Sequence, residues 1–121
     1  MAHGDVAHIE LSTTELAASR RFYEEIFGWR FDSMPGMEAY VLFRTPGGQG
    51  GGFVSGPMAD APSAVGPLLH LEVTDIDATL AKIASLGGRT LQPKTTISDE
   101  FGFFAVFLDN VGNRLGLWSR T

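Results

Sequence analysis

The chain has 121 residues, with 14 acidic and 9 basic side chains and a formal net charge of -5 at pH 7. The basic residues are scattered, which argues against nucleic acid as a partner. The absence of cysteine excludes disulfides, thiolate catalysis and zinc sites built on cysteine. No apolar run approaches the roughly 18–20 residues of a membrane span, and residues 1–6 lack a signal-peptide pattern. We therefore expect a cytoplasmic protein with no membrane partner.

The sequence contains an internal repeat. Residues 8–15 read HIELSTTE, and residues 70–77, which lie 62 positions later, read HLEVTDID. Each copy alternates apolar and polar residues and then changes to helical spacing, which predicts a strand followed by a helix. Ser12 with Glu15, and Thr74 with Asp77, have the spacing of a capping box at the start of each helix.

In both copies the predicted helix is followed by three short strands. The first helix ends at Gly28, and the second, about one turn shorter, ends at Gly87. Turn residues separate the predicted strands, which lie near residues 29–33, 38–44, 49–54, 89–91, 101–108 and 113–119. A polar loop is expected at residues 94–100.

This pattern predicts a single domain over residues 1–121, made of two repeats. The first βαβββ unit covers about residues 5–55, a proline-containing linker covers 56–66, and the second unit covers about 67–120. We expect an α+β fold in which the duplicated units form a curved mixed sheet, a cup, with the helices on its convex face.

The alternation along the first strand of each unit predicts which side chains line the cup. His8 and Glu10 lie on the face opposite the apolar residues Ile9 and Leu11, and His70 and Glu72 repeat this arrangement. A duplicated His–Glu pair on the face away from the core favours a polar ligand site. The competing interpretation is that these residues are solvated side chains on an exposed sheet face. Trp118 is expected to lie in the cup or at an interface.

Three segments resemble the vicinal oxygen chelate superfamily, which includes glyoxalase I, bleomycin-resistance proteins and extradiol dioxygenases. They are residues 8–11, the helix at residues 19–29, and the turn at residues 107–113, where Asn110 replaces the proline usual in that family. The chain is most similar to small relatives of lactoylglutathione lyase. The resemblance implies the duplicated fold over most of the chain.

The resemblance also implies a metal site, with one ligand from the first strand and one from the last strand of each unit, commonly His, Glu, His and Glu. His8 and His70 match the first-strand positions, whereas the last-strand positions are Gly52 and Gly116. We therefore expect no tightly bound metal, and we expect the glycines to leave room for a bulkier ligand. An alternative is a ferrous site made of His8, Glu10 and His70, which has the composition of a two-His-one-carboxylate triad.

Two functions remain open. The first is a homodimeric protein that binds a small organic molecule, as bleomycin-resistance proteins do, without a metal. The alternative is a metal-dependent lyase, isomerase or dioxygenase that uses His8 and His70 with zinc, nickel or iron, or uses Glu10 or Glu72 as a general base. The predicted ligand-binding residues are His8, Glu10, Gly52, His70, Glu72, Gly116 and Trp118.

Overall fold

The computed structural model describes residues 2–56, 61–62 and 65–121. The chain forms two compact units, Met1–Pro62 (unit 1) and Ser63–Thr121 (unit 2). Within the predicted linker at residues 56–66, residues 57–60 and 63–64 lie outside the described part of the chain. None of the described helices is long and apolar enough to cross a membrane.

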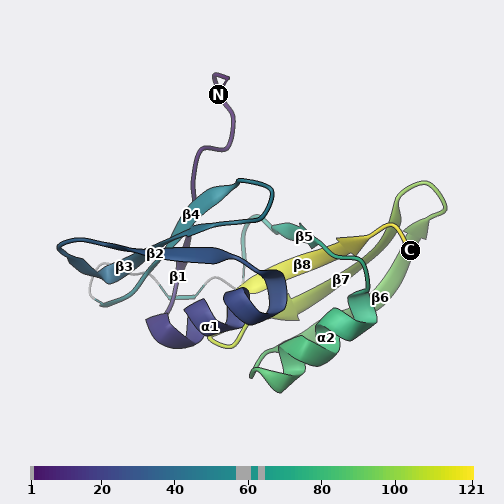
Figure 1. The fold of residues 1–121 in the computed structure, drawn as a ribbon. Helices are drawn as coiled ribbons and strands as arrows, with labels where there is room; N and C mark the ends of the chain where they lie inside the picture. The colour runs from purple at the N-terminus through teal and green to yellow at the C-terminus, as the bar shows by residue number, and fades with distance from the viewer. Residues whose placement is uncertain (1, 57–60, 63–64) are drawn as a thin grey trace. The chain divides into compact units, whose positions relative to one another are not determined.

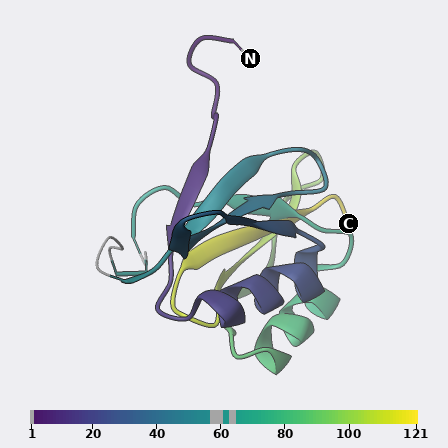
Figure 2. The same ribbon diagram turned by 60° about the vertical axis from the view of Figure 1, so that its left-hand side comes forward.

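Unit 1 contains one helix and a four-stranded mixed sheet (Figure 1). Its elements are β1 (Ile9–Ser12), α1 (Leu16–Phe27), β2 (Arg30–Met34), β3 (Met37–Arg44) and β4 (Gly50–Val54). The strand order is β1-β4-β3-β2, in which β1 pairs with β4 in parallel and the other pairs are antiparallel. The segment before β1 runs away from this sheet (Figure 2).

Unit 2 repeats this topology. Its elements are β5 (His70–Glu72), α2 (Ile76–Ser85), β6 (Arg89–Ser98), β7 (Gly102–Leu108) and β8 (Arg114–Ser119), in the sheet order β5-β8-β7-β6. The predicted α+β class with duplicated βαβββ units is therefore confirmed. The loop predicted at residues 94–100 is wrong in part, because β6 continues to Ser98 and pairs with β7 through Thr95 and Thr96.

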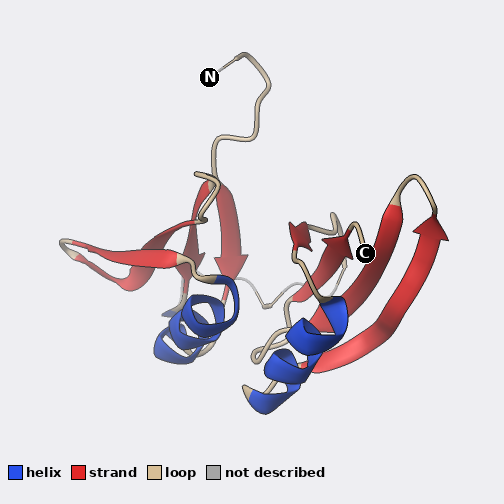
Figure 3. Cartoon of the chain, turned by 45° about the vertical axis from the view of Figure 1, so that its right-hand side comes forward, coloured by secondary structure: helices blue, strands red, loops and turns tan. Residues whose placement is uncertain are grey.

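Each helix packs on one face of its own sheet and leaves the other face free of helix (Figure 3). In unit 1 the packed face is aromatic. Tyr23 of α1 stacks on Trp29 with ring centroids 4.5 Å apart, and Trp29 stacks on Phe43 of β3 at 4.4 Å. Phe53 of β4 is fully buried against the same cluster. We call the opposite, helix-free surface of each sheet its open face.

The two repeats are related by a spacing different from the predicted one. The helices begin at Leu16 and Ile76, 60 residues apart, and follow the cap residues Glu15 and Asp75. The predicted capping boxes are therefore wrong. Asp75 accepts a hydrogen bond from the amide of Ala78 at 3.0 Å, whereas Glu15 makes no side-chain cap.

The glycines in left-handed conformation that follow the two helices show that the repeats differ little in length. Gly28 has φ +69° and Gly87 has φ +94°, and they lie 59 residues apart. The second copy is thus one residue shorter between helix start and terminating glycine. The predicted one-turn deletion is wrong: it came from aligning the first strands two residues out of register.

Candidate functional site

The open face of unit 1 carries the first predicted His–Glu pair. His8 lies directly before β1 and Glu10 lies within it, and both are exposed, whereas Leu11 is buried on the helix side. In unit 2, His70 and Glu72 are likewise exposed, with Leu71 between them less so. The period-two alternation therefore predicted the orientation of these residues within each unit correctly.

The pairing between first and last strands contradicts the idea that His8 and His70 occupy matching positions. In unit 1 it is Glu10 that lies level with Gly52 on β4. In unit 2 His70 lies level with Gly116 on β8. Glu10, and not His8, is therefore the counterpart of His70 in the sheet register. This agrees with the 60-residue spacing of the helices.

Tyr40 of β3 completes the polar cluster of unit 1. Its hydroxyl oxygen lies 2.7 Å from Nε2 of His8, and the two rings are nearly parallel, with centroids 6.4 Å apart. Tyr40 is not among the site residues predicted from the sequence. Its position in β3 could have identified it, because the period of two along the strand places Tyr40 on the same face as Leu42 and Arg44.

The ring of Tyr40 also covers Gly52. A Cβ atom added to Gly52 would overlap the ring and hydroxyl of Tyr40. In unit 2 a Cβ at Gly116 would overlap the imidazole of His70. The expectation that these glycines leave room for a ligand is therefore wrong, because the protein's own side chains fill both spaces.

Burial and the neighbouring Glu10 keep Tyr40 protonated. Burial, together with a hydrogen bond to Glu10 and the negative charge of that carboxylate, raises the pKa of Tyr40 from 10.0 to about 12. The phenol is therefore neutral at physiological pH and has one proton to donate. A phenol that donates to Glu10 and accepts from the Nε2–H of His8 satisfies all three groups, since a carboxylate only accepts.

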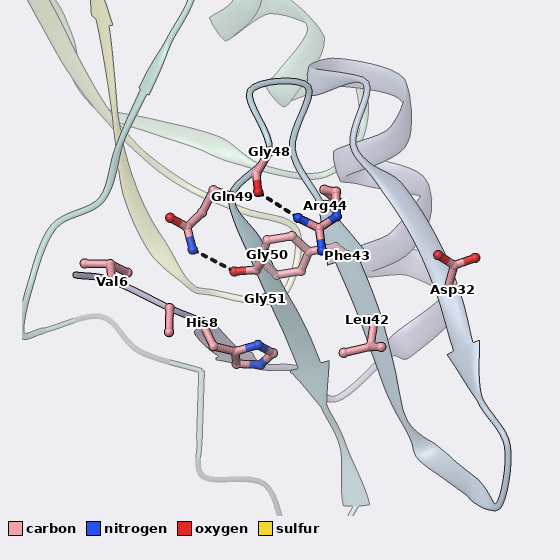
Figure 4. A pocket seen from close by; sticks show the side chains of 11 residues that line it. Val6, His8, Asp32, Leu42, Phe43, Arg44, Gly48, Gln49, Gly50 and Gly51 are labelled. Carbon is pink, nitrogen blue, oxygen red and sulfur yellow. Dashed lines mark hydrogen bonds between the residues drawn. The ribbon is translucent and has the colours of Figure 1, made fainter. Parts of the chain in front are cut away.

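A hollow of about 290 Å³ opens beside this cluster on unit 1 (Figure 4). His8 lies on one side of it and Asp32 of β2 on the other, with Leu42 and Arg44 of β3 between them. The end of the turn between β3 and β4 and the start of β4 line it through residues 48–51. The hollow therefore combines apolar, cationic and hydrogen-bonding groups on the open face.

In unit 2 the open-face residues are tied to one another and to the backbone. The indole N–H of Trp118 donates to the carbonyl of Phe101 at 2.7 Å, and the guanidinium of Arg120 lies 5.7 Å from the indole centroid. Trp118 lies level with Glu72 on β5. The one hydrogen-bond donor of Trp118 is therefore used within the protein and Arg120 lies over one face of its ring, so the other ring face and the Glu72 carboxylate remain as contact groups.

The donor set does not fit the metal site that the resemblance implies. Across residues 2–56, 61–62 and 65–121, no group of three or more His, Asp or Glu side chains is placed to hold a metal ion. In unit 1 the Nε2 atom of His8 contacts Tyr40, and Gly52 supplies no ligand. Neither unit by itself contains the His and Glu ligands that the resemblance implies.

The duplicated βαβββ units, each with a parallel first–last strand pair and a polar open face, define a glyoxalase-type fold. The Glyoxalase/Bleomycin resistance protein/Dioxygenase superfamily matches residues 5–117. The chain therefore belongs to this superfamily, as the resemblance implied.

Known proteins agree with this assignment. The chain is 29% identical over 114 residues to CFP32 of Mycobacterium tuberculosis, which carries the name of a glyoxylase; the match covers 91% of this chain and 43% of CFP32. The chain thus spans less than half the length of that relative.

Two solved structures have a similar fold. The family enzyme from Burkholderia phytofirmans has a TM-score of 0.78 and 17% identity, over 98% of this chain and 100% of that one. TnmS3 from a Streptomyces species, described as an antibiotic binding protein, has a TM-score of 0.73 and 25% identity, over 100% of this chain and 99% of that one.

Proposed function

We propose that this protein binds a small organic molecule on the open face of unit 1, in the hollow beside His8. The observation that carries the proposal is the hollow itself, which joins an apolar wall at Leu42 to the hydrogen-bonded cluster of His8, Tyr40 and Glu10. Small-molecule sites are typically concave and apolar with a few placed polar groups. The similarity to TnmS3, an antibiotic binding protein, supports the same function.

We extend the proposal to the open face of unit 2 as a second contact surface. His70 and Glu72 are exposed there, and Trp118 presents an aromatic ring whose N–H is already bonded. His70 fills the space over Gly116, so a ligand would meet the imidazole rather than the strand backbone. Gly52 then acts by accommodating Tyr40 on the open face of unit 1, and Gly116 by accommodating His70 on the open face of unit 2.

In this proposal binding requires no metal. The Nε2 atom of His8 already has a partner in Tyr40, and the described residues offer no third metal ligand of the His or carboxylate type. Catalytic zinc usually keeps three protein ligands, so two imidazoles are a weak site. The alternative is a metal-dependent lyase, isomerase or dioxygenase that uses His8 and His70, with Glu10 or Glu72 as general base.

The binding test uses a neutral aromatic probe, 2-naphthamide, and follows the backbone amides of the ¹⁵N-labelled full chain by NMR. We expect the amides of residues 48–51 and of His8 to shift, equally with and without a chelator. Leu42→Asn removes part of the apolar wall and should weaken binding. Leu91→Asn, which changes an exposed leucine of unit 2, is the matched control and should have no effect.

A metal analysis separates the two functions. Protein purified without added metal or chelator should contain far less than one equivalent of zinc, nickel or iron. Stoichiometric metal that is lost in His8→Ala would overturn the metal-free proposal and support the alternative. Probe shifts that appear only after metal is added would have the same meaning.

We also propose that the protein is a homodimer. Each four-stranded sheet has two edge strands, and one of them, β6, is ten residues long and exposes Leu91 and Ile97. Long edge strands with exposed apolar residues tend to be covered by a partner. Light scattering should give twice the mass of the chain, and a monomer at working concentration would contradict this proposal.

A further inference from the structure

Arg44 is a cationic side chain of the hollow that the predicted site did not include. It ends β3 and lines the hollow of unit 1, where its Nη1 donates to the carbonyl of Gly48 at 2.8 Å (Figure 4). Gly48 has φ +99°, a left-handed conformation that favours glycine, so the turn presents this carbonyl to the arginine. One of the five guanidinium N–H donors is thus used to fix the side chain at the edge of the hollow.

The positive charge of Arg44 is not neutralised by the surrounding protein. In the described part of the chain, Arg44 forms no ion pair; the two ion pairs of unit 1 join Arg20 to Glu24 and Arg21 to Glu25 on α1. A second cation, Arg30, lies directly opposite Arg44 on the neighbouring strand β2. Arg30 does not line the hollow itself, but with Arg44 it forms a cationic pair on the open face, although the whole chain has a net charge of -5.

Asp32 is the one acidic side chain that lines the hollow. Asp32 lies opposite Leu42 in the β2–β3 pairing, next to the Arg30–Arg44 pair on the same face. Among the described residues it makes no ion pair with either arginine. Glu10 and Asp32 both lie in the row of the open face that contains Leu42, whereas the neighbouring row, Arg30, Arg44 and Gly50, contains no acidic residue. A guanidinium with free donors favours a planar anion, because its N–H groups match both carboxylate oxygens.

We propose that the hollow of unit 1 binds an organic carboxylate, with the anionic group on Arg44 and an apolar body against Leu42. The inference rests on the proposed small-molecule binding and adds the chemical class of the ligand. The opposite end of the ligand meets His8, whose imidazole is held by Tyr40. The volume of about 290 Å³ lies at the lower end of the range for ligand pockets and selects a small acid.

The test compares two probes that differ in charge and match in shape, 2-naphthoate and 2-naphthamide, by NMR titration of the full chain. We expect naphthoate to shift the amides of residues 48–51 and to bind about tenfold more tightly than the amide. Arg44→Gln should remove this preference, because it weakens the binding of naphthoate about tenfold. Arg21→Gln removes the same charge from α1, where Arg21 is paired with Glu25, and should keep the preference.

Two further measurements keep the test decisive. Arg44→Lys keeps the positive charge but loses the planar, forked guanidinium, and should retain a smaller part of the preference for naphthoate. This variant replaces Arg44→Gln in the test if the glutamine variant does not fold, as judged by its amide spectrum. Added salt should weaken binding of naphthoate and leave binding of naphthamide unchanged, because the interaction with Arg44 is partly exposed.

The outcomes distinguish the two proposals. Equal affinity for both probes at residues 48–51 would overturn the carboxylate inference and leave small-molecule binding intact. A naphthoate preference that survives in both Arg44 variants would place the anion elsewhere and would also overturn the inference. If neither probe shifts these amides, both proposals fail.

Discussion

The substitution Gly52→Ala tests whether Tyr40 is held over β4 as the structure shows. An added Cβ would overlap the Tyr40 ring, so the ring must swing away and give up its hydrogen bonds to His8 and Glu10. Gly52 does not have a positive φ, so alanine fits the backbone. The cost therefore comes from the displaced ring rather than from strain at residue 52.

The expected magnitude follows from these contacts. Two hydrogen bonds at roughly 1 kcal/mol each give a loss of about 2 kcal/mol. Replacing glycine by alanine lowers the entropy of the unfolded chain, which offsets about 0.4–1 kcal/mol. We therefore expect Gly52→Ala to lower the free energy of unfolding by about 1–1.5 kcal/mol. In a Tyr40→Ala background the same substitution should be neutral or slightly stabilising.

Urea unfolding of the four proteins in this double-mutant cycle gives the coupling energy between residues 40 and 52, which we expect to be about 1.5–2 kcal/mol. Gly116→Ala is the matched control, because it displaces the ring of His70, which makes no hydrogen bond within the described residues. It should cost less than about 0.5 kcal/mol. An equal cost of Gly52→Ala with and without the Tyr40 ring would refute this reasoning.

Three other predictions follow from the hydrogen bonds. The difference in ultraviolet absorbance between wild type and Tyr40→Phe should titrate near pH 12, and Glu10→Gln should lower this midpoint; a midpoint near pH 10 in wild type would contradict the assigned contacts. Because the folded-state pKa lies above the unfolded value, the stability that this tyrosine contributes is complete below pH 10 and is lost as the pH rises through about 12. Asp109→Ala removes an acceptor of three backbone amides in the β7–β8 turn and should cost about 2–3 kcal/mol in urea unfolding, whereas Asp99→Ala, at an exposed position, should have almost no effect. Asp75→Ala removes the cap of α2 and should cost about 1 kcal/mol; an unchanged unfolding midpoint would argue against this cap.

The sequence predicted the duplicated topology because strands and helices leave local periodic signals. The period of two identified the open-face residues of β1 and β5 before their partners were known, and the turn residues separated the strands that follow each helix. The resemblance to the superfamily was carried by short local segments, and the superfamily match over residues 5–117 confirms it.

The alignment of the two repeats could not be settled by the same signals. Both copies contain His–apolar–Glu, and matching these letters gave a spacing of 62 residues. The helix starts and the strand register give 60 instead, which places Glu10 where His70 lies in the other unit. A shift of two residues preserves the period of two, so alternation along a strand cannot detect it.

The sequence by itself thus determined which elements form and which way each first-strand side chain points, because both depend on neighbours along the chain. Only the tertiary structure decided what those side chains meet. Tyr40 reaches Glu10, Gly52 and His8 because β3 pairs with β4 and β4 pairs with β1. The contact between Tyr40 and His8 joins residues 32 positions apart in sequence. Strand pairing is a contact between segments that are distant in sequence, so local periodicity does not specify it. The same pairing places Arg44 and His8 in the lining of one hollow.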